Sequence, residues 1–394
     1  MRPIRSATLA VLTSIALVAP LTGCQSLQDD QPVAEILIAA DLELSGAAAS
    51  IGAAYQRALE LKVEQLNESG ALGNRQIRLK IKDNRSDPTE SLRNIGEFTA
   101  DPMVHAIIMG SCNECAIGAT KTINDSRVPT IALAPATDVA IPVAQRRYMF
   151  KLAPNAIDDA AALVTELKEQ GLNQVSLVYT DDPYGRDGLA AMTDELRKAG
   201  IELVGTARVQ STDTDVSDAV AALTADEPDA IVAWTSAEQA TLVARYTEES
   251  GYPGQLFFDA AAAGDLFFES AAAKSVDGTT MVFTPTMVID DTIATTPAKA
   301  ARKQWFRAYT ARFGGYYGLS SFAADAIQLL ADASLRGDGA DGTMNRDGMR
   351  DVLETSQVDG LSGPIRMTPD NHSGLMPQAL TILVATGGRW RLAG

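Results

Sequence analysis

The pattern best suited to chemistry is Cys112-Asn113-Glu114-Cys115, in which two residues separate two cysteines. In an oxidising compartment such a pair can close a tight local disulfide, and the same spacing occurs in thioredoxin-like redox motifs. Those motifs normally open a helix after a strand in a much smaller domain. A metal site would need two further ligands, and the chain has only two histidines, His105 and His372. We therefore expect structural or pocket-lining cysteines and no metal, with redox chemistry as the alternative.

The third cysteine, Cys24, ends a segment that is typical of a bacterial lipoprotein export signal. Arg2 and Arg5 precede an apolar run from Ala7 to Pro20, and Leu21-Thr22-Gly23 leads to the cysteine. The apolar run is shorter than the roughly 20 residues that a membrane-spanning helix needs. This order of features predicts cleavage before the cysteine and attachment of a lipid to it.

The segment therefore predicts a signal peptide over residues 1–23, lipidation at Cys24 and a polar tether over residues 24–32. The folded part is expected outside the cytoplasm, held by lipid to an inner or an outer membrane. The formal net charge of −17 makes nucleic acid and anionic lipid head groups poor partners. With 394 residues, the chain exceeds what one hydrophobic core usually supports, so two lobes are expected.

Catalysis is not expected. Paired carboxylates occur at Asp181-Asp182 and Asp290-Asp291, but neither pair lies beside a nucleophile motif. No Gly-x-Ser-x-Gly elbow, phosphate loop or dinucleotide fingerprint follows a first strand. We predict a protein that is not an enzyme and that needs no cofactor.

Short runs rich in Val, Ile and Leu alternate with longer amphipathic segments, which predicts parallel strands joined by helices. The expected strands are 36–40, 77–82, 106–109, 130–133, 174–179, 202–207, 230–234, 255–258, 381–385 and 390–392. The expected helices are 51–67, 88–100, 116–125, 157–170, 186–199, 237–250, 297–313 and 320–335. The fold class is therefore α/β, with two doubly wound parallel-sheet lobes.

The chain is expected to cross between these lobes three times. A first break lies near Tyr148-Lys151, a second near Met281-Pro285, and a last one before Gly363-Met367. The N-terminal lobe would then contain residues 33–152 and 286–360, and the C-terminal lobe residues 153–285 and 361–394. Lobes joined by several strands can bend towards each other.

Several motifs resemble those of the type I periplasmic binding proteins, specifically the branch that binds leucine, isoleucine and valine or related amides. The resemblance runs over essentially the whole mature chain. It is carried by Leu44-Ser45-Gly46 with Gly52, Leu66-Asn67-Glu68-Ser69-Gly70, Gly73-Asn74-Arg75, Asp83 to Pro88, the loop after Gly110, Val128-Pro129, Tyr148-Met149-Phe150-Lys151 and Pro183-Tyr184-Gly185. It implies two lobes joined by a three-strand hinge, closing around a ligand that is then delivered to an ABC permease in the membrane.

The resemblance implies a branched-chain amino acid as the default ligand, with an amide such as urea or an aromatic acid as alternatives. A sensory subunit for a membrane kinase or receptor is the rival function, and a purely structural surface lipoprotein is a third. The protein is expected to be a monomer. Ligands of open parallel sheets bind beyond the carboxyl ends of the strands, where helix N-termini present unpaired amides. A ligand carboxylate would gain charge-assisted hydrogen bonds there, so a zwitterion suits the architecture.

In the first lobe the resemblance assigns the ligand carboxylate to Glu114 and Thr137, with the carbonyl of Pro135 beside them. Glu114 departs from the family pattern, because a glutamate repels an anionic group unless it is protonated or turned away. Asn113 and Ala136 belong to the same two loops and complete this part of the predicted site.

Two further side chains are assigned to the walls of the site. Tyr184 matches the position whose ring packs on the ligand, and Ile51 falls where the family has a pocket wall.

In the second lobe the resemblance assigns the ligand ammonium to an acidic residue just after a strand. That position falls on Ala260, with Asp259 adjacent, so Asp259 is the partner if the loop is shifted by one residue. Otherwise the polar groups near Trp234, Thr235 and Ser236 must bind the ammonium, and Trp234 offers a stacking surface for a ring.

Overall fold

The computed structural model describes residues 34–263, 273–338 and 345–393. The predicted signal peptide, the lipidated Cys24 and the tether lie outside these ranges. Among the described residues, no helix has both the length and the apolar character that would let it cross a membrane.

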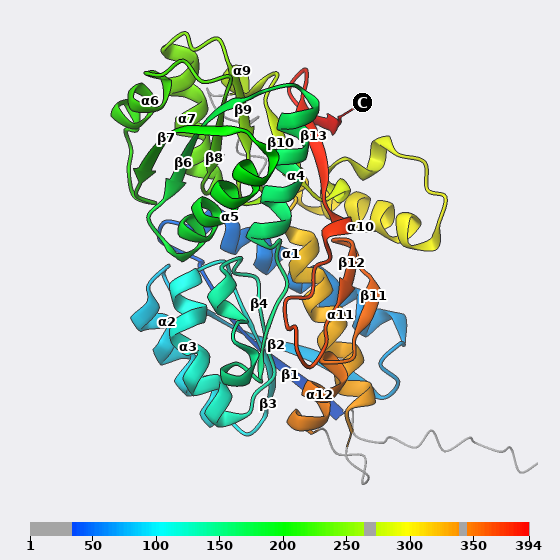
Figure 1. The fold of residues 1–394 in the computed structure, drawn as a ribbon. Coiled ribbons are helices and arrows are strands. Elements are labelled where there is room, and N and C mark those ends of the chain that lie inside the picture. Colours follow the sequence, from blue (N-terminus) through cyan, green and yellow to red (C-terminus); the bar gives the residue numbers. More distant parts are fainter. Residues whose placement is uncertain (1–33, 264–272, 339–344, 394) are drawn as a thin grey trace, which may run out of the picture.

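The first sheet contains five parallel strands in the order β2-β1-β3-β4-β5. They are β1 (Ala34–Leu42), β2 (Arg75–Asp83), β3 (Val104–Met109), β4 (Thr130–Ala132) and β5 (Met149–Lys151). The intervening helices are α1 (Ala49–Ser69), α2 (Pro88–Ala100) and α3 (Asn113–Ser126). We call this sheet and the helices packed on it the first lobe; it lies below the second in Figure 1.

The second sheet has the order β14-β13-β10-β9-β8-β6-β7. Its parallel strands are β6 (Gln174–Thr180), β7 (Glu202–Val209), β8 (Ala230–Trp234), β9 (Gln255–Phe258) and β10 (Thr280–Phe283). Around it lie α4 (Ala156–Glu169), α5 (Pro183–Ala199), α6 (Ser217–Thr224), α7 (Ala237–Glu249) and α9 (Ala273–Val276). The antiparallel strands β13 (Thr381–Ala385) and β14 (Trp390–Leu392) complete the second lobe.

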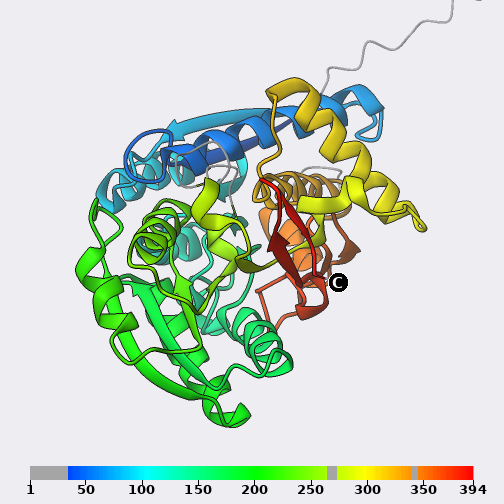
Figure 2. The same ribbon diagram turned by 90° about the horizontal axis from the view of Figure 1, so that it is seen from above.

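Between β10 and β13 the chain returns to the first lobe. There α10 (Pro297–Phe313) and α11 (Ser320–Arg336) flank α1, and α12 (Arg346–Leu353) packs on α11. Figure 2 shows α1 and α10 side by side, and the Tyr309 hydroxyl of α10 donates to the Ala54 carbonyl of α1 at 3.4 Å. A small hairpin of β11 (Gln357–Asp359) and β12 (Pro364–Arg366) follows.

The expected α/β class with two mainly parallel sheets is confirmed. The last crossing differs in place: it was expected before Gly363, whereas β12 pairs with β11 and Ser373 bridges Lys151 of the first sheet. The chain therefore leaves the first lobe after Ser373, because the hairpin completes its pairing there before β13 joins β10.

In each sheet the first strand of the lobe lies between the next two: β1 lies between β2 and β3, and β6 lies between β7 and β8. The connections from the first strand and from its neighbour therefore run in opposite directions. This opens a crevice beyond the carboxyl ends of these strands. In the first lobe the crevice lies between Glu43 and Gly110, which follow β1 and β3. In the second lobe it lies between the residues that follow Thr180 and Trp234.

The close approach of α1 to the end of β1 depends on Gly52. A Cβ on this residue would lie 2.0 Å from the carbonyl oxygen of Glu43. Replacing Gly52 with Ala should therefore lower the free energy of unfolding by about 2 kcal/mol or more, because backbone must move to make room. Chemical denaturation measures this change.

Gly96→Ala is the matched control, since Gly96 lies in α2 with open space around its Cβ position. Helix propensity favours Ala over Gly there by about 0.5–1 kcal/mol, so this variant should be stabilised. Equal effects of the two substitutions would contradict the packing argument.

Candidate functional site

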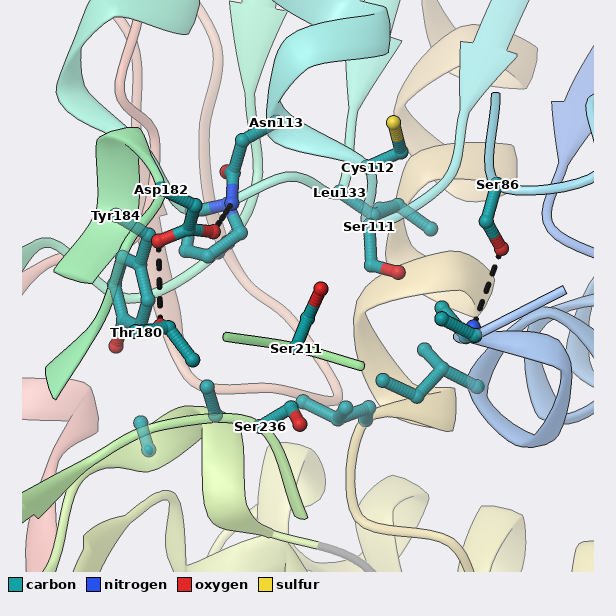
Figure 3. A pocket seen from close by; sticks show the side chains of 18 of the residues that line it. Ser86, Ser111, Cys112, Asn113, Leu133, Thr180, Asp182, Tyr184, Ser211 and Ser236 are labelled. Carbon is teal, nitrogen blue, oxygen red and sulfur yellow. Dashed lines mark hydrogen bonds between the residues drawn. The ribbon is translucent and has the colours of Figure 1, made fainter. Parts of the chain in front are cut away.

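A cavity of about 200 Å³ lies between the two lobes, beyond the carboxyl ends of their strands (Figure 3). We call it the interlobe cavity. Residues of both lobes line it, so its shape depends on how the lobes meet. The aliphatic hydroxyl groups of its lining belong to Ser86, Ser111, Thr180, Ser211 and Ser236, and its aromatic rings to Tyr55, Tyr184 and Phe322.

The first-lobe wall is built on the carboxylate of Glu43, which is 0% exposed. Its Oε2 accepts hydrogen bonds from the Ser111 amide at 3.0 Å and the Ser111 hydroxyl at 3.2 Å. Its Oε1 accepts from the Cys112 amide at 3.1 Å and from Asn84 Nδ2 at 3.1 Å. One carboxylate therefore ties the end of β1 to the loops that follow β2 and β3.

A second buried carboxyl group, Asp41, extends this polar cluster into the sheet. Asn84 Nδ2 also donates to Asp41 at 3.1 Å, and Asn94 Nδ2 and the Ser91 hydroxyl donate to it at 2.8 and 2.5 Å. Burial raises the pKa of Asp41 to about 6 in spite of these donors, and the charge of Glu43 adds to the rise.

Asn113 and Asp182 link the lobes at one side of the cavity. The Asn113 side chain donates to Asp182 Oδ2 at 3.1 Å and accepts from the Ala136 amide at 2.9 Å (Figure 3). Asp182 also caps α5 by accepting from the Gly185 amide at 2.7 Å. The local sequence explains this cap, because Asp followed by Pro183 is a common helix start.

Two further hydrogen bonds join the lobes. The Thr137 amide donates to Asp187 Oδ2 at 2.7 Å, and the Ser50 hydroxyl donates to Glu238 Oε1 at 2.7 Å. Thr137 and Ser50 belong to the first lobe, and Asp187 and Glu238 lie on α5 and α7 of the second. The structure is therefore a closed arrangement of the two lobes.

The charged side chains among the described residues that line the cavity are three carboxylates: Glu114, Asp182 and Glu238. Glu114 is exposed overall, but partial desolvation raises its pKa, and the nearby Asp182 adds to the rise. The interior of the site is thus electronegative.

The second-lobe wall is held in place by hydrogen bonds to Asp259, which is buried behind Tyr184. Its carboxyl group accepts from the Tyr184 hydroxyl at 2.5 Å and from the Thr235 and Ala261 amides at 3.0 and 3.1 Å. Trp234 packs on Tyr184 with ring centroids 5.6 Å apart. Burial raises the pKa of Asp259 to about 7, although these donors act in the opposite direction.

Lys151 marks the first crossing between the lobes. It is buried, and its Nζ donates to the carbonyls of Pro135 at 2.7 Å and Pro154 at 3.1 Å. Burial lowers the pKa of Lys151 to about 8, while nearby carboxylates, Asp159 first among them, oppose that shift. The Pro135 carbonyl that was predicted to face a ligand is thus bound by Lys151.

Cys112 and Cys115 form a disulfide, and Cys112 lines the cavity at the start of α3. Among the described residues, no group of three His, Cys, Asp or Glu side chains could hold a metal ion.

The predicted site residues divide into two groups. Those that line the interlobe cavity are Ile51, Asn113, Glu114, Pro135, Tyr184, Ser236 and Ala260. Those that lie behind its walls or at its rim are Ala136, Thr137, Trp234, Thr235 and Asp259. The main chain of the second group still shapes the site, because the amides of Ala136, Thr137 and Thr235 are bound by side chains.

Cys112 lines the cavity, which agrees with the expectation of structural or pocket-lining cysteines. Several other lining residues were not among the predicted site residues: Tyr55, Ser86, Ser111, Asp182, Ser211, Glu238, Leu319 and Phe322. Ser86 and Ser211 follow strands β2 and β7, so the strand-end rule could have found them. Leu319 and Phe322 lie at the start of α11, and nothing in the local sequence indicates that this helix returns to the cavity.

A family model described as periplasmic binding protein matches residues 35–389. Among solved structures, an extracellular ligand-binding receptor from Rhodopseudomonas palustris HaA2 is 22% identical with a TM-score of 0.82, over 91% of this chain and 100% of that one. A leucine-binding protein from Thermotoga maritima MSB8 is 19% identical with a TM-score of 0.78, over 91% and 98%.

A solute-binding protein of an ABC transporter from Rhodopseudomonas palustris BisB5, solved with 3,4-dihydroxybenzoic acid, is 17% identical with a TM-score of 0.78, over 90% and 95%. Glutamate receptor 3.7 of Arabidopsis thaliana is 28% identical over 153 residues, which are 38% of this chain but only 16% of that receptor. At these identities the solved structures show the fold alone.

The raised pKa of Asp259 predicts a pH-dependent stability. The unfolded chain loses this proton near pH 3.9, whereas the folded chain keeps it up to about pH 7. Within that window the folded state binds more protons, so the free energy of unfolding should fall as the pH rises. Relative to Asp259→Asn, the slope should reach at most about 1.4 kcal/mol per pH unit, measured by denaturation at each pH.

Asp226→Asn, which removes an exposed carboxylate, controls for the loss of one negative charge. If wild type and Asp259→Asn keep a constant difference from pH 4 to pH 7, the carboxyl of Asp259 does not hold its proton in the folded state.

Proposed function

This chain belongs to the periplasmic binding protein family, and from that membership we propose that it is a solute receptor that delivers a small organic ligand to an ABC importer. Members of the family are non-enzymatic receptors. The observation that carries the proposal is the interlobe cavity, which residues of both lobes line and which hydrogen bonds between the lobes close. Such a cavity needs lobe opening for entry and release.

An amino group on the ligand fits the charges of the cavity. Glu114, Asp182 and Glu238 line it, and a positively charged group would pair with one or more of them. These carboxylates are better placed for that role than Asp259, whose oxygens already accept from Tyr184, Thr235 and Ala261.

The relatives with solved structures support a small ligand and differ in its chemistry. One is named as a leucine-binding protein, and another was solved with 3,4-dihydroxybenzoic acid. An amino-acid-like ligand, with a branched-chain amino acid as the starting assumption, remains our proposal for the class of compound. The volume of about 200 Å³ lies below the roughly 300–1,000 Å³ that is typical of pockets for drug-sized ligands, which favours a small ligand.

We also propose that Cys24 carries a lipid that holds the receptor outside the cytoplasm, close to its permease. The sequence around that cysteine supports this assignment. The predicted tether would keep the two lobes free to open and close at the membrane surface.

Ligand-dependent stabilisation tests the receptor function. The chain from Gln25 onward should be unfolded thermally with amino acids, amines, amides and aromatic acids. A ligand at 100 times its dissociation constant should add about 2.7 kcal/mol to the free energy of unfolding, and X-ray scattering should show a smaller radius of gyration. If no compound in a broad panel stabilises the protein, the receptor function is wrong.

Lobe closure should contribute to affinity through the bond between Asp187 and the Thr137 amide. Asp187→Ala removes the acceptor and destabilises the closed arrangement, so the dissociation constant of the ligand found in the panel should rise about fivefold to tenfold. Calorimetry measures this change.

Asp194→Ala on the same helix is the control, because Asp194 pairs with Arg197 and Lys198 at the surface. The control should bind like wild type, and an Asp187→Ala variant with unchanged affinity would exclude a role for this bond in closure.

A further inference from the structure

Four amides in the two first-lobe loops to which the resemblance assigns a ligand carboxylate are already bound by side chains of the protein. The Ser111 and Cys112 amides, at the entrance to α3, donate to Glu43 at 3.0 and 3.1 Å. The neighbouring loop shows the same arrangement, since the Ala136 amide donates to Asn113 and the Thr137 amide to Asp187. A ligand carboxylate would have to displace an internal partner from each of these donors.

The position of Glu43 is built into the fold. Its carboxylate is fully buried, and Asn84 Nδ2 donates to the same oxygen, Oε1, that accepts from the Cys112 amide. Gly110 makes room for it, because a Cβ there would lie 2.1 Å from Glu43 Oε2. The side chain is therefore a fixed part of the first-lobe wall, and Ser111 and Cys112, which it binds, line the cavity directly.

Three amides of the second lobe are bound by side chains in the same way. The Gly185 amide at the start of α5 donates to Asp182, and the Thr235 and Ala261 amides donate to Asp259. Among the described residues that line the cavity, none is Lys or Arg. An anionic group would enter a site whose lining holds three carboxylates and no cation, which is costly in a partly desolvated space. Lys151 lies behind the wall, where its Nζ already donates to the Pro135 and Pro154 carbonyls.

We propose that Glu43 is a built-in occupant of the first lobe's anion site, and that the interlobe cavity consequently selects a small organic cation without a carboxylate. The inference rests on the proposed receptor function and narrows its ligand, because it replaces the branched-chain amino acid that was the starting assumption with a cation that has no carboxylate. Glu43 acts as a specificity-determining residue, because its carboxylate lies behind the cavity wall and already accepts from the Ser111 and Cys112 amides that a ligand carboxylate would need.

The rest of the wall suits a cation. Glu114 and Asp182 line one side of the cavity, and Glu238 lies across from the first lobe on α7. Tyr55, Tyr184 and Phe322 also line the cavity, and the faces of aromatic rings attract organic ammonium groups. Amines of a few carbon atoms match both the chemistry and the volume.

Matched ligands separate this inference from the receptor function. The chain from Gln25 onward should be titrated with cations that lack a carboxylate (3-methylbutylamine, leucinamide, 1,4-diaminobutane and choline) and with carboxylates (leucine, 4-methylpentanoate and 3,4-dihydroxybenzoate). Thermal unfolding and calorimetry give the affinities. At least one cation should bind at least tenfold more tightly than every carboxylate.

The outcomes are distinct. Tighter binding of leucine or another carboxylate than of any cation would overturn the cation assignment and leave the receptor function standing. Binding of no compound in either set, together with no stabilisation in the broad panel, would overturn both.

Variants that remove one carboxylate each test which side chains bind the cation. Glu114→Gln and Glu238→Gln should each weaken cation binding about tenfold, the loss expected for one charge-assisted hydrogen bond. Glu68→Gln, which changes an exposed glutamate of α1, should bind like wild type. Unchanged affinity in both cavity variants would exclude carboxylate recognition of a cation.

Chemical rescue tests the role of Glu43 itself. Glu43→Ala leaves the Ser111 and Cys112 amides without their acceptor, so the unfolding midpoint should fall and added acetate should raise it again. Wild type should show no acetate-dependent rise. If the variant is unfolded without acetate, folding on its addition is the equivalent result.

Glu43→Gln keeps an oxygen in the same place and should fold without responding to acetate. Failure of acetate to stabilise or fold Glu43→Ala would show that these amides do not form an anion site, and would overturn the role given to Glu43.

Discussion

The hydrogen bonds between the Glu43 carboxylate and the Ser111 and Cys112 amides are the constraint on which the first lobe depends. They hold the loop after β1 against the loop after β3, at the point where the sheet order changes. Two glycines allow this approach: Gly52 against the backbone of Glu43, and Gly110 against its side chain. One buried carboxylate therefore fixes the position of the start of α3 and of the cavity wall beside it.

Much of the fold could be predicted from the sequence because buried parallel strands are covered on both faces and read as continuous apolar runs. Most of the parallel strands were expected for this reason, including the short β8, Ala230–Trp234. Strands β5 and β10, which lie at two of the expected crossings, and the hairpin strands β11 and β12 were not expected. Helix α12 was missed because only Met349 and Leu353 of its eight residues are buried. Two buried positions are too few to show a helical periodicity of apolar residues in the sequence. The last crossing was misplaced because pairing between β11 and β12 depends on partners distant in the chain.

The candidate site was predictable where it follows strand ends, as at Asn113, Tyr184 and Ser236. The direction in which a side chain points at such a position could not be predicted. Asp259 follows β9 as expected, but its carboxyl group turns inward to Tyr184 and the Thr235 amide. Phe322 reaches the cavity through the packing of α11 on the first lobe, which depends on the whole fold and leaves no local signal.

The return of α10 and α11 to the first lobe has a consequence for how the protein is made. Helix α1 packs against α11, which follows it by most of the length of the chain, and Arg75 of β2 donates to the Ser334 carbonyl at 2.8 Å. The core of the first lobe therefore cannot close while the ribosome is still producing the second. Contacts of such long sequence separation form late and slowly. The amino-terminal half thus stays unfinished, and open to chaperones, until synthesis is nearly complete.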